Sequence, residues 1–155
     1  MFVFDTGSFI VLGHYYPAQF PSFWEQFNGS VKTGLVVSCR EVHRELTGHG
    51  SSAHLQAWIK TNKHIFHPPD PQESAFVAQV FAVPHFGQLV TQKQQLKGSP
   101  VADPFVIASA KIRNATVVTE ELFKPNAAKI PNVCSHFGVP CMTLEKFLQT
   151  QNWTF

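Results

Sequence analysis

The sequence is poor in cysteine and has no long apolar run, and both absences narrow the class of protein. The three cysteines are an odd number at irregular spacing, which argues against the disulfide framework of a small secreted domain. No stretch approaches the ~20 consecutive apolar residues of a membrane span. The apolar N-terminus has no basic region and contains Asp5, so it is a poor signal peptide. We therefore expect a protein of the reducing cytoplasm without a membrane partner.

Net charge is also low. The formal charge of +2 is too small to indicate a nucleic-acid partner, so any basic surface must be local. The hydrophobic fraction of 44% argues against disorder. A chain of 155 residues is long enough for one domain that buries roughly two thirds of its unfolded surface. We expect a single domain over residues 1–155.

Short apolar runs alternate with segments of helical pattern. The runs predict strands at 2–4, 35–38, 115–119 and 139–142. Helices are expected at 8–14, 21–34, 38–48, 53–61, 72–83, 86–96, 104–114 and 144–151. This alternation predicts an α/β protein with a mostly parallel sheet. Ligands of such sheets bind outside the carboxyl ends of the strands.

Three of the expected helices begin with capping signals. Ser38 and Glu41 have the Ser-x-x-Glu spacing of a capping box. Asp103 is the expected N-cap of the helix that opens with Pro104, and Thr143 is the expected cap of the last helix.

The few acidic residues concentrate where the predicted sheet would bind a ligand. Of ten in the chain, six lie near the expected strand ends or in the helices that follow: Asp5, Glu41, Glu45, Asp103, Glu120 and Glu121. Crowded carboxylates repel one another unless a cation lies among them. Ligand sets of oxygen alone favour Mg²⁺ or Mn²⁺, and such a site suits phosphodiester hydrolysis.

Each acid also has a structural explanation. Asp5 can cap the turn that follows it, and Glu41 can be the capping partner of Ser38, which leaves Glu45 as the favoured ligand. An N-cap role alone would explain Asp103. One of Glu120 and Glu121 can be a solvated loop charge.

Four segments together resemble the acidic blocks of the PIN-domain nucleases. They are Asp5-Thr6 after an apolar strand, "VHREL", "ADPFVIASAK" and "TVVTEE", and the resemblance covers nearly the whole chain. The closing "KIPNVCSHFGVPCMTLEKFL" is similar to a bacterial and archaeal branch of PIN-like proteins. The resemblance implies a three-layer α/β/α sandwich and a Mg²⁺- or Mn²⁺-dependent endoribonuclease. Many such relatives are toxins inhibited by a small antitoxin protein, and homodimers are common among them.

The resemblance also assigns roles to single residues. It implies that the catalytic metal ligands are Asp5, Glu45, Asp103 and Glu121, supported by the hydroxyls of Thr6 and Thr119. Glu121 stands where the family usually has Asp, Gly7 replaces a small polar residue, and Glu41 is an extra acid that can substitute for Glu45. The cations expected to contact the RNA backbone are Arg40, Arg44, Lys93 and Lys97, although lysines of a polar helix also fit a solvated face.

Other interpretations fit less of the chain. An aspartic protease needs two Asp-Thr-Gly loops on an all-β fold, and a haloacid-dehalogenase-like phosphatase needs an acid at the position of Gly7. Zinc sets drawn from His64 and His67, or from Cys134, His136 and Cys141, have no regular spacing. The remaining alternative is a catalytically degenerate PIN scaffold that binds RNA or a protein partner.

Overall fold

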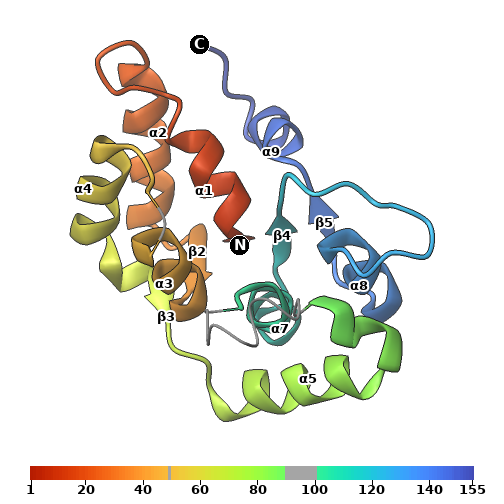
Figure 1. Ribbon diagram of the computed structural model, residues 1–155. Helices are drawn as coiled ribbons and strands as arrows, with labels where there is room; N and C mark the ends of the chain where they lie inside the picture. Colours follow the sequence, from red (N-terminus) through yellow and green to blue (C-terminus); the bar gives the residue numbers. More distant parts are fainter. Residues whose placement is uncertain (49, 90–100) are drawn as a thin grey trace.

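A parallel sheet of five strands lies between two layers of helices (Figure 1). The computed structural model describes residues 1–48, 50–89 and 101–155. The strands are β1 (Phe2–Phe4), β2 (Val36–Cys39), β3 (Phe66–His67), β4 (Thr116–Val118) and β5 (Cys141–Met142). They follow the order β3-β2-β1-β4-β5, and every neighbouring pair is parallel. The predicted α/β class is confirmed, and the layers are those of an α/β/α sandwich.

Aromatic side chains hold one helical layer against the sheet. This layer contains α1 (Thr6–Leu12), α2 (Pro21–Lys32) and α9 (Leu144–Thr150). Phe2 and Phe4 are two residues apart in β1 and therefore face the same side. The ring centroid of Phe4 lies 5.7 Å from those of Phe9 and Phe27 and 5.1 Å from that of Phe147. One strand residue thus joins all three helices.

The other layer is centred on α7 (Asp103–Arg113), which lies against β1, β2 and β4. Two further helices, α5 (Pro71–Ala82) and α8 (Ile130–Phe137), pack on α7. Asn114 and Gly138 end α7 and α8 in the left-handed conformation, with φ values of 52° and 66°. A residue of this kind closes the last turn of a helix, and Asn114 is the predicted end of α7.

The middle of the chain contains the strand that the pattern did not reveal. β3 has only two residues, before a proline pair, and it pairs with β2 through Ser38 and Cys39. The described residues also form α3 (Arg40–Gly48), α4 (Ala53–Thr61) and the 3₁₀ helices η1 (Lys63–Ile65) and η2 (Pro84–Leu89). Of the helix expected at 86–96, residues 86–89 lie in η2, and 90–96 lie outside the described residues. No helix in the described ranges is both long and apolar enough to cross a membrane.

Two of the three predicted caps are wrong. Ser38 belongs to β2, and its hydroxyl donates to the carbonyl of Phe4 at 2.7 Å, so no capping box begins α3. Asp103 is the first residue of α7 and Ala102 is its N-cap. The prediction for Thr143 is confirmed, since its side chain accepts from the N–H of Lys146.

Candidate active site at the carboxyl edge of the sheet

The carboxyl ends of β1 and β4 meet where the strand order reverses, and this is where parallel sheets bind ligands. Asp5 follows β1 and Thr119 follows β4. The Thr119 hydroxyl donates to one oxygen of Asp5 at 2.5 Å, and the N–H of Ser8 donates to the other at 2.7 Å. Asp5 is 4% exposed and Thr119 is 1% exposed. Asp5 is therefore the N-cap of α1 and a fixed carboxylate at the sheet edge.

Three other carboxylates accept hydrogen bonds from backbone N–H groups at the starts of other helices. Glu45 accepts from Ala102 at 3.0 Å, Glu121 from Ile130 at 2.8 Å, and Glu120 from Leu144 at 2.8 Å. Helix starts leave N–H groups unpaired and carry the positive end of the helix dipole, so they stabilise anions. The acids thereby tie α7, α8 and α9 to the carboxyl edge of the sheet.

Each of the two predicted supporting hydroxyls contacts one of the predicted acids. Thr6 donates to Glu45, and this bond connects the start of α1 with α3. Thr119 donates to Asp5 and also accepts from the N–H of Glu121 at 3.1 Å. One threonine therefore fixes two of the acids.

The pKa of Asp103 shows that the other acids lie close to it. Burial, together with the charges of Glu121, Glu45 and Asp5, raises the pKa of Asp103 to about 7. Burial also raises the pKa of Asp5, against the hydrogen bonds from Thr119 and Ser8. The four acids that the resemblance assigns to the site therefore lie near enough to repel one another.

Proximity alone does not make a preformed metal site. Within residues 1–48, 50–89 and 101–155, no group of three or more His, Cys, Asp or Glu side chains is placed to hold a metal ion. Glu45 directs its oxygens to Thr6 and Ala102, and Glu121 directs its oxygens to Ile130 and Lys129. Each of these oxygens therefore already has a protein partner with which a bound ion would compete.

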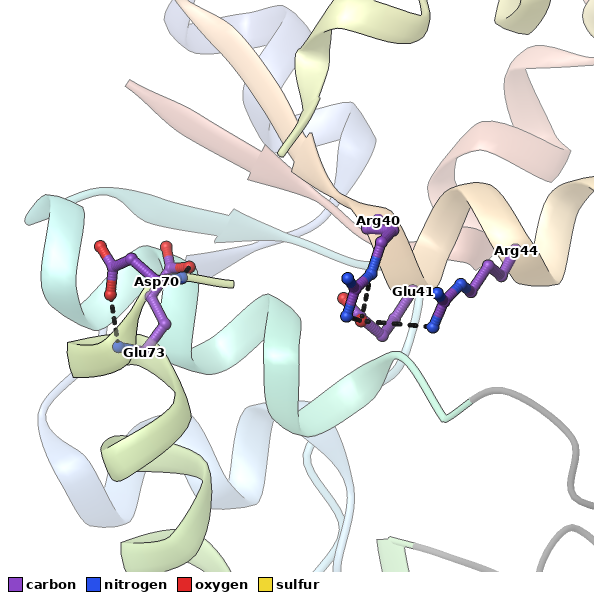
Figure 2. A network of polar contacts seen from close by, with 5 residues as sticks. All are labelled: Arg40, Glu41, Arg44, Asp70 and Glu73. Atoms are coloured by element: carbon purple, nitrogen blue, oxygen red, sulfur yellow. Dashed lines mark hydrogen bonds and ion pairs between the residues drawn. The ribbon is translucent and has the colours of Figure 1, made fainter. Parts of the chain in front are cut away.

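Glu41 is engaged with the two arginines expected to contact RNA (Figure 2). One carboxylate oxygen lies 2.8 Å from Nη2 of Arg40 and 3.9 Å from Nη1 of Arg44. Its other oxygen is buried and has no hydrogen-bond partner within the described part of the chain. Both arginines therefore neutralise a buried acid of their own helix. Lys93 and Lys97 lie outside the described residues.

The sequence did not single out one cation at the site. Nζ of Lys129 lies 3.6 Å from a carboxylate oxygen of Glu121, and its charge lowers the pKa of Asp103. No local pattern marks Lys129, because the loop from β4 to α8 must fold back to bring it to Glu121. Ser8 was also missed, although its position three residues after Asp5 is the spacing of an N-cap contact.

Comparison with known families gives one match over almost the full chain. The model of a family described as "Domain of unknown function (DUF4411)" matches residues 2–155. No curated protein matches the chain.

Proposed function

The chain belongs to the family of domains of unknown function DUF4411, and we propose that it is a metal-dependent endoribonuclease that hydrolyses RNA phosphodiester bonds. The observation that carries the proposal is the gathering of acids at the carboxyl edge of the sheet, where Thr119 contacts both Asp5 and Glu121, and Glu45 accepts from Ala102 beside Asp103. Carboxylates from four separate segments gather at the edge where such sheets bind ligands. The resemblance of the sequence to PIN-domain nucleases supports the same activity.

The donors at this edge fit a hard divalent cation. Asp5, Glu45, Asp103 and Glu121 offer only oxygen, which is the ligand that Mg²⁺ and Mn²⁺ prefer. Their mutual repulsion is a cost to the folded protein that a bound cation would remove. When bound, the cation would activate a water and neutralise the leaving oxygen of the phosphate.

The residues themselves have different duties in this proposal. Asp5 is the fixed ligand, because Thr119 and Ser8 hold both of its oxygens. Glu45 and Glu121 are ligands that exchange a backbone N–H for the ion. Asp103 is the third acid of the set, and a bound cation would lower its pKa from about 7 and keep its carboxylate ionised at neutral pH. Lys129 supplies a positive charge for the RNA phosphate.

The same resemblance supports a biological setting. We infer that the protein is the toxin of a toxin–antitoxin pair, acts on cytoplasmic RNA and is inhibited by a small antitoxin protein. A homodimer is consistent with that family. A small neighbouring gene for a DNA-binding protein would support this assignment, and a housekeeping nuclease would have no such neighbour.

One observation favours the second candidate, a degenerate scaffold that binds RNA or a protein without cleavage. Glu45 and Glu121 already have backbone donors, so the acids can serve as structural caps alone. Titration calorimetry with Mn²⁺ separates the two functions, because a scaffold that has lost its metal site takes up no ion.

The deciding assay is cleavage of single-stranded RNA by the purified protein with Mg²⁺, with Mn²⁺ and with EDTA. We expect cleavage with either metal, none with EDTA, and loss of cleavage in Asp5→Asn. Glu25→Gln is the matched control, since Glu25 is an exposed acid of α2. A wild-type protein inactive under every metal, or an Asp5→Asn variant as active as the wild type, would show the proposal to be wrong.

A further inference from the structure

Two cavities meet at Glu121. The first, of about 380 Å³, is mainly apolar and is lined by Leu122, Phe123, Val139 and Met142 beside Glu121. The second, of about 360 Å³, is more polar and contains Asp103, Glu121 and Lys129. The first has the size of a small-molecule site, and the second belongs to the acidic edge described above. Lys129 and the cation of the proposed site would offset the charges of Asp103 and Glu121, so a ligand that occupies both cavities would carry a flat or apolar group next to an anionic one.

A long loop joins β4 to α8 (Figure 1). Two of its apolar residues, Leu122 and Phe123, line the first cavity. Leu122 is 71% exposed and Phe123 is 60% exposed. Exposure of large apolar side chains next to one another marks an interaction surface. Neither residue is needed for the core, so their place beside Glu121 calls for a ligand.

The same loop is anchored on both sides of these two residues. Before them, the N–H of Glu121 donates to Thr119 at 3.1 Å. After them, Asn132 of α8 donates from its side-chain amide to the carbonyl of Lys124 at 2.7 Å and accepts from the Lys124 N–H at 3.4 Å. The backbone on both sides of Leu122 and Phe123 is thus held before a ligand arrives, which reduces the entropy lost on binding.

We propose that the first cavity is a nucleobase subsite for single-stranded RNA, with the base stacked on Phe123 and the adjoining phosphate in the second cavity. This inference rests on the proposed ribonuclease function. An unpaired base offers a flat face to an aromatic ring, whereas a base in a duplex is already stacked on its neighbours.

Charge favours a nucleotide over an apolar protein segment. Lys124 directly follows the exposed pair, Lys129 ends the same loop, and Lys129 lines the second cavity. A phosphate backbone that passes between the cavities would meet these cations, and an apolar peptide would gain nothing from them. The subsite therefore contacts the flat face that every base has, and it discriminates little between bases.

The test is the affinity of the full-length protein for a short single-stranded RNA that carries 2-aminopurine, a fluorescent base whose emission falls when it stacks. Binding is measured with Mg²⁺ on an Asp5→Asn background, so that the RNA remains intact. We expect Phe123→Ala to weaken binding roughly tenfold and to abolish the quenching. Phe123→Trp should restore both. Phe123→Leu, which is apolar but cannot stack, should resemble Phe123→Ala.

Phe81→Ala is the matched control, because Phe81 is an exposed phenylalanine on α5, away from the cavity. If Phe123→Ala binds RNA as tightly as the protein with Phe123, and the wild type cleaves RNA, the proposed subsite is wrong and the proposed ribonuclease function is retained. If Phe123→Leu retains full affinity, the surface is an apolar docking site and stacking is wrong. If the protein neither cleaves nor binds RNA, the proposed function fails and the subsite with it.

Discussion

Asp103→Asn should stabilise the metal-free protein at alkaline pH. The substitution replaces a partly buried carboxylate with a neutral amide of nearly the same size. We expect this stabilisation because burial and three neighbouring carboxylates raise the pKa of Asp103 from 3.8 to about 7. The folded state therefore binds the proton of Asp103 more tightly than the unfolded state does. As a result, ionisation of Asp103 destabilises the fold as pH rises from 3.8 towards 7.

The size of the effect follows from that difference in pKa. At ~1.4 kcal/mol for each pKa unit, ionised Asp103 lowers the free energy of unfolding by at most about 4 kcal/mol at pH 8. At pH 5 only the difference between the pH and the unfolded pKa of 3.8 contributes, and the penalty is about 2 kcal/mol. The neutral variant removes this penalty, so its advantage should roughly halve between pH 8 and pH 5.

Urea unfolding followed by circular dichroism in EDTA measures this difference. For a chain of this length, each kcal/mol also corresponds to about 2–4 °C in melting temperature. Glu25→Gln is the control for loss of one negative charge at an exposed position of α2. In Mn²⁺ the wild type should be the more stable of the two proteins. An ion bound to the native state stabilises that state, and Asp103→Asn offers the ion one ligand fewer.

Two results would refute this reasoning. One is an Asp103→Asn protein no more stable than the wild type at pH 8 in EDTA. The other is a gain in stability that stays constant between pH 8 and pH 5, because a constant gain cannot arise from titration of Asp103.

Further substitutions test the contacts that build the site and the core. Thr119→Val should cost about 1–3 kcal/mol in urea unfolding, because it leaves buried Asp5 and the N–H of Glu121 without their partner. Phe147→Ala should cost about 3–5 kcal/mol in the same assay, since the ring is fully buried against β1. Asp70→Ala should cost about 1 kcal/mol through loss of the α5 N-cap, and Asp70→Asn should retain most of that stability.

The caps show where local pattern is sufficient and where it fails. Thr143 was predicted because a polar residue before an apolar helical segment needs only its own neighbours to cap it. Ser38 has the same local pattern, yet β2 continues through it, and its hydroxyl bonds to Phe4 of the adjacent strand. Asp70 and Glu73 form a capping box that begins α5 after a proline pair, and it was not among the predicted caps (Figure 2).

Arg40 and Arg44 show that the position of a charged residue in the sequence does not identify its partner. The sequence places them near the acids, which suggested contact with RNA. In the fold, both lie beside Glu41, whose carboxylate is only 4% exposed, and so they offset a buried negative charge. Lys129 has no local signal and lies at Glu121, because the loop of eleven residues over 119–129 returns from β4 to α8.

The sequence by itself determined the α/β alternation, four of the five strands and the acids that follow their ends. These features depend on local periodicity and on residue type, which a linear sequence contains. Tertiary packing was needed to bring Glu121, Glu45 and Asp5 near enough to raise the pKa of Asp103, and to pair Glu41 with two arginines. Those distances depend on strand order and helix packing, since the hydrogen bond between Asp5 and Thr119 joins residues 114 positions apart.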